Sequence, residues 1–198
     1  MNLKGRELYN AWEKAISEKD VSAISDLLEQ SPKLLHQEIF HYRGNGTTYS
    51  ILPLHLVNKS LEATQLLIDA GTDPNELGHG NVLAIHDASL EVVKYLISVG
   101  ANVNKIGYEE CTPLMYEVYV GNIKNVQYLI EQGADVNYQR KLDGYTSLHF
   151  AAQKCGLEMI QLLLKHGAHT HLKNDKNQTA LDLAKEKSFT EALDILKP

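Results

Sequence analysis

Four short segments of this chain are near copies of one another, and each follows an apolar run with helical character. They read AGTDPN at 70–75, VGANVN at 99–104, QGADVN at 132–137 and HGAHTH at 166–171. Their glycines are 29, 33 and 34 residues apart along the chain. Recurrence at this period indicates a stack of supersecondary units in which each unit contacts its neighbours, rather than one globular core. Such a fold acts mainly through an extended surface.

The most complete unit covers residues 143–174. It opens with DGYTSLHFAAQK, in which Asp-Gly marks a turn and Thr146 is placed to cap the helix that follows. A second amphipathic helix is predicted by apolar residues at helical spacing, and Gly167 is expected to end it. These apolar residues are Leu157, Ile160, Leu163 and Leu164.

This order of turn, Thr-Pro-Leu-His-x-Ala-Ala helix, second helix and Gly-Ala-Asp-x-Asn ending resembles the ankyrin repeat. The segment from Cys111 to Asn137 is similar as well, since it opens with CTPLM and ends with GADVN. The resemblance implies an all-α ankyrin repeat solenoid of about six helix–turn–helix units with projecting β-turns or hairpins. It covers residues 1–198, which we expect to form a single domain.

The units differ in completeness. Residues 1–35 are expected to form an N-terminal cap repeat, in which Asp20 caps the second helix. Residues 36–50 are an insertion whose β-prone arms surround Gly-Asn-Gly, a strong hairpin signal. Residues 51–174 hold four central repeats. Two of these, the second and third units of the whole chain (52–75 and 82–104), are shortened in or after the first helix. Residues 175–198 keep the start of a repeat and carry exposed lysines, which suits a C-terminal cap.

Composition excludes several classes of partner. The net charge is −6, and residues 1–99 hold 8 basic against 13 acidic residues. No basic stripe follows the chain, so nucleic acid is not an expected partner. No run of 18 apolar residues and no leader-like segment is present, which argues against a membrane partner. Two cysteines in different repeats favour a reducing, cytoplasmic location.

The motifs searched for catalysis and cofactor binding are absent from the sequence. There is no phosphate-binding loop, no nucleophile elbow and no His-Glu-x-x-His. His166, His169 and His171 cluster across a helix end, but we interpret them as solvated loop residues rather than a metal site. His55 and His149 stand at the family's Leu-His position, which the resemblance implies is structural. We therefore predict no catalytic, cofactor-binding or metal-binding residues and no enzymatic activity.

Tyrosine carries the better functional signal, with ten tyrosines against three phenylalanines. Tyrosine offers a large contact area for little entropy loss and is frequent at interaction hot spots. Several tyrosines, with charged neighbours, fall where the resemblance places contact positions, at the turn tips and on the first helices. The predicted partner-binding residues are Tyr42, Tyr49, Tyr108, Glu109, Tyr116, Glu117, Tyr119, Arg140, Lys141, Tyr145 and Lys154.

Glu117 departs most clearly from the repeat, because the next unit has Ala151 at the same place. A glutamate at a packing position should reduce stability unless it reaches solvent or finds a partner. An alternative interpretation of Tyr116 and Tyr119 is that they fill space left by the shortened third repeat.

The first functional hypothesis is a non-enzymatic module that binds another protein through its concave face and hairpin tips. Its acidic N-terminal half favours a partner with a basic surface, and we expect a monomer when the chain is free. Within this class the chain looks like small bacterial ankyrin proteins, some of which neutralise cognate toxins; a host-directed effector and a cytosolic scaffold are alternatives. A further alternative is self-association through an apolar strip left by the shortened repeats.

Overall fold

The computed structural model describes residues 3–42, 48–154 and 156–197. These residues form two compact units, Met1–Ala101 and Asn102–Pro198. The regular structure in the described ranges is almost entirely α-helical, with one two-stranded sheet, so the predicted all-α class is confirmed. The tip of the expected hairpin at 43–47 and Cys155 lie outside the described residues.

The first unit begins with the helix pair α1 (Leu3–Glu18) and α2 (Val21–Gln30). Asp20 caps α2 as its position predicts, because its carboxylate accepts a hydrogen bond from the backbone N–H of Ala23 at 3.1 Å. Trp12 and Ile16 of α1 are fully buried. A short 3₁₀ helix, η1 (Pro32–His36), follows α2 and packs against it.

The next segment is the antiparallel pair β1 (Ile39–Tyr42) and β2 (Thr48–Ile51). Its register pairs Ile39 with Ile51 and Tyr42 with Thr48.

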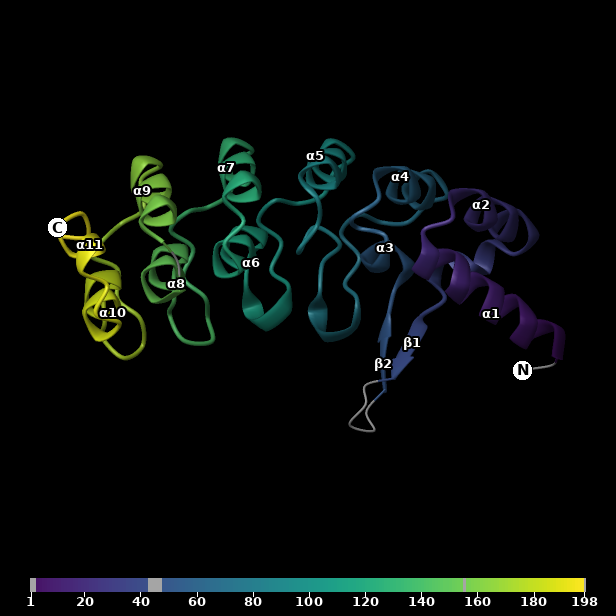
Figure 1. Cartoon of the computed structure of the whole chain (residues 1–198), viewed down its shortest axis with the longest axis horizontal. Coiled ribbons are helices and arrows are strands. Elements are labelled where there is room, and N and C mark those ends of the chain that lie inside the picture. Colours follow the sequence, from purple (N-terminus) through teal and green to yellow (C-terminus); the bar gives the residue numbers. More distant parts are fainter. Residues whose placement is uncertain (1–2, 43–47, 155, 198) are drawn as a thin grey trace. The chain divides into compact units, whose positions relative to one another are not determined.

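The remaining helices of the first unit are α3 (Pro53–Leu56), α4 (Leu61–Asp69) and α5 (Leu90–Ser98). Helix α3 is a single turn. The 3₁₀ turn η2 (His79–Asn81) comes after α4, and residues 82–89, between η2 and α5, contain turns but no helix. Figure 1 shows α2, α4 and α5 side by side in one row, and α4 packs against both neighbours.

The second unit contains three helix pairs. These are α6 (Pro113–Val120) with α7 (Ile123–Glu131), α8 (Ser147–Lys154) with α9 (Leu157–Lys165), and α10 (Ala180–Glu186) with α11 (Thr190–Leu193). The first helices α6, α8 and α10 pack on one another in a row (Figure 1). The 3₁₀ turn η3 (Tyr108–Glu110) precedes α6.

The repeated endings connect one helix pair to the next. Gly133 and Gly167 have φ of 88° and 84°, which glycine adopts without the strain that a side chain would cause. The Asn137 amide donates to the carbonyl of Gly167 at 2.9 Å, and its Oδ1 accepts from the N–H of His169 at 2.8 Å. Asn104 contacts the ending that follows it in the same way: its amide donates to the carbonyl of Gly133 at 3.1 Å, and its Oδ1 accepts from the N–H of Asp135 at 2.8 Å. These asparagines therefore brace the loops.

The two histidines of the Leu-His motif have the structural role that the resemblance implies. His149 Nδ1 accepts from the N–H of Thr146, so its Nε2 carries the proton and donates to the carbonyl of Gln178 at 3.0 Å. His55 Nε2 lies 2.9 Å from the carbonyl of Val82 in the following turn. Burial lowers the pKa of both imidazoles, which keeps them neutral.

Candidate functional site

The second unit contains a pocket of about 230 Å³ beside the turn that holds η3, bordered by helices α6 and α8. Five of the residues that sequence analysis selects for partner binding line it. The complete lining is Tyr108, Glu109, Cys111, Tyr116, Tyr119, Arg140 and Phe150. Residues up to 42 positions apart in the chain thus converge on one concavity.

Aromatic side chains form the outer walls of this pocket. Tyr108 and Tyr119 are 41% and 47% exposed, whereas Phe150 is buried at 5%. The rings of Tyr119 and Phe150 meet edge to face, with centroids 5.9 Å apart and an interplanar angle of 84°. This T-shaped contact is a favoured aromatic geometry, so the buried ring holds the exposed ring in place.

Arg140 forms a fixed cation at the base of the pocket and is only 8% exposed. Its Nε and Nη2 donate to the two carboxylate oxygens of Asp143, at 2.9 and 2.5 Å. Its Nη1 lies 3.4 Å from the Glu109 carbonyl oxygen and 3.5 Å from Cys111 Sγ. The guanidinium carbon lies 4.9 Å from the centroid of the Phe150 ring. Such a bidentate, stacked arrangement suits arginine and not lysine.

The electrostatics of this ion pair are consistent with its geometry. The hydrogen bond to Asp143 raises the pKa of Arg140, so the guanidinium stays charged. Burial alone would raise the pKa of Asp143. The hydrogen bonds from Arg140 and from the N–H of Tyr145, together with the charge of Arg140, outweigh burial and hold that pKa below its usual value. Arg140 already donates two hydrogen bonds to Asp143, so it acts as a structural part of the pocket.

Glu109 lies at the rim, with its side chain 56% exposed and its carboxylate 3.6 Å from Arg140 Nη1. Both Glu109 and Glu110 have positive φ, at 50° and 58°. Two consecutive non-glycine residues in this region cost about 1–3 kcal/mol each, and such strain is concentrated at functional sites. Glu109 is therefore presented at the rim by a strained turn.

Lys154 contacts the outer face of Tyr119. Its Nζ lies 4.3 Å from the ring centroid and donates to the Tyr119 hydroxyl at 3.1 Å. The structure thus already places one cation against an aromatic wall of the site, which is a favourable cation–π arrangement.

Glu117 is fully buried, and its carboxylate accepts a hydrogen bond from Asn125 Nδ2 at 3.0 Å. The Glu117 side chain faces α7 and not the pocket. The sequence required it either to reach solvent or to find a polar partner, and it has found a partner in Asn125. Its exposure of 0% leaves it no surface to offer another protein.

The other predicted residues lie around or away from the pocket. Lys141 is exposed on the 139–145 turn, and the half-buried Tyr145 packs its ring against Phe150 at 5.3 Å between centroids. Tyr42 and Tyr49 belong to β1 and β2 in the first unit, and their side chains lie outside the described part of the chain.

Sequence reasoning missed three residues of the site. Cys111 and Phe150 line the pocket, and Asp143 orients Arg140. Asp143 and Arg140 are three residues apart in one turn, a spacing at which a bidentate pair forms, and that spacing was the available signal. Phe150 occupies the variable position x of the Leu-His-x-Ala-Ala pattern and carries no separate signal.

Cys111 is the thiol in the lining of this pocket. Burial raises the pKa of the Cys111 thiol, which keeps it protonated and a poor nucleophile. Among the described residues, no group of three or more His, Cys, Asp or Glu side chains is placed to hold a metal ion. The rings of His169 and His171 stack at 5.2 Å between centroids, but within the described ranges no third such side chain joins them in a group that could hold a metal ion. None of the helices that the structure describes combines the length and hydrophobicity needed to cross a bilayer.

Paired helices, projecting turns, αL glycine endings and an asparagine ladder together define a helix–turn–helix repeat protein. A family model for ankyrin repeats (3 copies) matches residues 54–140 and, again, 114–197. The chain belongs to the ankyrin repeat family. Ankyrin repeats are generally protein–protein interaction modules without catalytic activity of their own.

Similar curated proteins share short stretches of the chain. A probable E3 ubiquitin-protein ligase XBOS34 from Oryza sativa subsp. japonica is 51% identical over 38% of this chain and 15% of its own length. The human ankyrin repeat and SOCS box protein 11 is 37% identical over 43% of this chain and 26% of its own length. The 2-5A-dependent ribonuclease of Mus musculus is 36% identical over 38% of this chain and 10% of its own length. Each match covers a minor part of the relative, and the ligase and ribonuclease match only through their ankyrin parts.

Proposed function

We propose that the chain binds a partner protein through the aromatic pocket of the second unit and the turns around it. The observation that carries this proposal is the convergence of Tyr108, Tyr116 and Tyr119 with Glu109 and Arg140 on one concavity. Exposed aromatic anchors around a pocket are what hot spots of protein interfaces consist of.

The chemistry of the rim favours a partner segment that brings apolar and basic side chains. Arg140 is committed to Asp143, so it offers little to an incoming anion. Glu109 is exposed at the rim, and exposed tyrosine faces accept both apolar groups and cations. The strained η3 turn keeps Glu109 beside the pocket, which reduces the ordering cost of binding.

The test compares partner capture by the full chain and by two variants, Tyr108→Ala and Tyr119→Ala. Both residues are more than 40% exposed, so the fold should survive while contact area is lost. We expect the affinity for the captured partner to fall about tenfold or more for each variant, because a hot-spot truncation costs about 2 kcal/mol.

Tyr128→Ala provides the matched control. Tyr128 lies on α7 of the same unit, is half-exposed and does not line the pocket. Its truncation should leave affinity within about twofold. Equal affinity of Tyr108→Ala, Tyr119→Ala and the unchanged chain, measured by titration calorimetry, would rule out this placement.

A further inference from the structure

The first unit contains a second concavity, on the row of second helices, that the proposed binding site does not include. It has a volume of about 400 Å³ and lies between α2, η1 and α4. Its lining consists of Ser25, Leu28, Glu29, Pro32, Leu35, Leu66, Asp69 and Ala70. We call this the α2–α4 groove.

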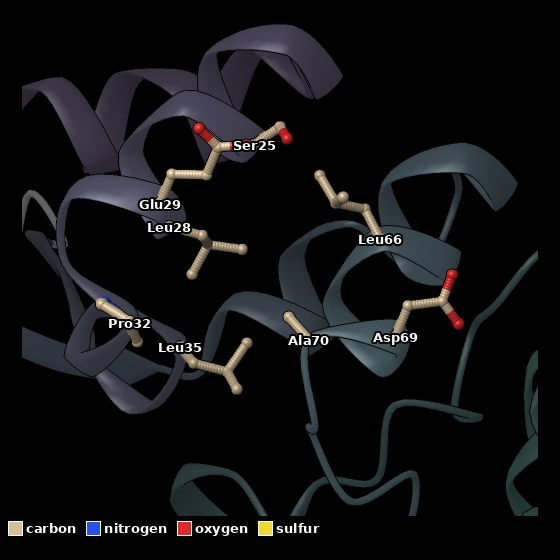
Figure 2. Close-up of a pocket in the computed structure, with 8 residues that line it drawn as sticks. All are labelled: Ser25, Leu28, Glu29, Pro32, Leu35, Leu66, Asp69 and Ala70. Carbon is tan, nitrogen blue, oxygen red and sulfur yellow. The ribbon is translucent and has the colours of Figure 1, made fainter.

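The floor of the groove is apolar. Figure 2 shows Leu28 and Leu35 on one side and Leu66 and Ala70 on the other, all directed toward the space between the two helices. Leu28 and Leu35 are 9% and 8% exposed, whereas Leu66 is only half-buried. A groove of this volume with leucine walls accommodates an apolar side chain of leucine or phenylalanine size.

The edges of the groove are acidic. Glu29 of α2 and Asp69 of α4 hold their carboxylates outside the apolar floor (Figure 2), and both residues are exposed. Helices α2 and α4 carry only acidic charged residues, since Asp26 and Glu62 are the others. Among the described residues no ion pair engages Glu29 or Asp69, and the nearest basic residue along η1, Lys33, does not line the groove.

We infer that the α2–α4 groove docks a partner segment that inserts one apolar side chain and carries basic side chains on either side of it. An apolar anchor removes the leucine floor from water, and flanking cations meet the acidic edges on two helices. A second copy of this chain is a poor occupant, because its net charge of −6 would repel the acidic edges. The inference concerns the first unit alone and does not depend on the pocket around Arg140.

The test uses the full chain, labelled with ¹⁵N, and a synthetic amphipathic helical peptide composed of leucine and lysine. A peptide with glutamate in place of every lysine serves as the second probe. We expect amide shift changes from the leucine–lysine peptide to be concentrated at residues 25–35 and 66–70, and much weaker binding of the leucine–glutamate peptide. The pair Glu29→Gln with Asp69→Asn should weaken binding of the leucine–lysine peptide about fivefold, which corresponds to about 1 kcal/mol for the two exposed ion pairs together.

The matched control is the pair Asp26→Asn with Glu62→Gln. It removes the same two charges from the same two helices, at exposed residues outside the groove lining. It should change affinity by less than about twofold, because screened charges beyond contact distance contribute little. Ala70→Trp should fill the groove and abolish the localised shifts; Ala70 has ordinary right-handed helical geometry, which tryptophan also adopts.

Three results would overturn the inference. One is equal weakening by the groove pair and the control pair, which indicates non-specific attraction to an acidic surface. Another is equal binding of the glutamate peptide, which excludes charge recognition. The third is a set of shift changes that avoids residues 25–35 and 66–70. Loss of binding by Tyr108→Ala bears on the proposed function only, so the two hypotheses fail separately.

Discussion

The carboxylate of Glu117 in α6 accepts a hydrogen bond from the side-chain amide of Asn125 in α7 at 3.0 Å, and both side chains are buried. In the next repeat, Ala151 and Met159 stand at the same positions, 34 residues later, and both are buried as well. One repeat therefore joins its two helices with a polar pair where the following repeat uses an apolar pair of small and large side chains.

This relationship predicts strong coupling between the two positions. Glu117→Ala or Asn125→Met alone should lower the free energy of unfolding by about 3 kcal/mol, because each removes the hydrogen bond between two buried polar side chains. The double variant reproduces the Ala151 and Met159 arrangement and should return to within about 1 kcal/mol of the unchanged chain. Urea unfolding in a double-mutant cycle measures the coupling, and simple additivity of the two single effects would contradict it.

Arg140→Lys is predicted to destabilise the second unit although the charge is kept. Lysine loses the two-point contact with Asp143 and the stacking on Phe150, so we expect a loss of about 1–2 kcal/mol. Thermal unfolding followed by circular dichroism measures it. Lys141→Arg is the adjacent, exposed control and should stay within about 0.5 kcal/mol. A neutral effect of Arg140→Lys would show that the bidentate geometry contributes nothing to stability.

The helices and their endings could be predicted from the sequence because each has a local cause. Asp20 stands before an apolar helical pattern and caps α2, and Gly133 has the positive φ that its place after a helix requires. The partner of Glu117 could not be predicted in this way, since Asn125 lies on another helix and also departs from the repeat. The sequence indicated only that Glu117 needed a partner or solvent.

The sequence indicated which tyrosines of the candidate site would be exposed, but it did not indicate that Arg140 would be buried. Tyr108 and Tyr119 are exposed at the pocket, as expected for residues on turns and first helices. Arg140 is charged and lies in a turn, which favours exposure, yet its contacts with Asp143 and Phe150 bury it. The α2–α4 groove has no sequence signal at all, because it arises from incomplete packing between two helices whose apolar periodicity is ordinary.

Asn137→Asp is predicted to weaken the junction between the last repeats of the second unit. The carboxylate still accepts from the N–H of His169, but it cannot donate to the carbonyl of Gly167. Loss of that hydrogen bond, and the new negative charge facing a carbonyl oxygen, should cost about 1–2 kcal/mol. Hydrogen exchange should rise mainly for amides between 168 and 197, because stability in a repeat array is set between neighbours. A uniform rise in exchange across residues 102–197 would contradict the prediction that Asn137 stabilises only the junction with the next repeat.

Because His86 is buried, we expect the free energy of unfolding to decrease on mild acidification. Burial, with the nearby His55 as a second cause, lowers the pKa of His86 from its usual 6.5 to about 4. Between these values the imidazole takes up a proton in the unfolded chain and not in the folded chain, so the free energy of unfolding decreases as pH falls through this window. The complete loss attributable to His86 is about 3 kcal/mol, from about 1.4 kcal/mol for each unit of pKa difference.

The variant His86→Met isolates this contribution. Met115 stands at the corresponding position of the next repeat and is fully buried, so methionine suits this environment. We expect His86→Met to have a shallower decline in stability between pH 6.5 and 4 than the unchanged chain, with a residual slope from His55 and His149, whose pKa values are also lowered by burial. Replacement of the exposed His79 by methionine is the control and should leave the slope unaltered. Urea unfolding across this pH range makes the measurement, and an unchanged slope in His86→Met would show that His86 does not couple proton binding to folding.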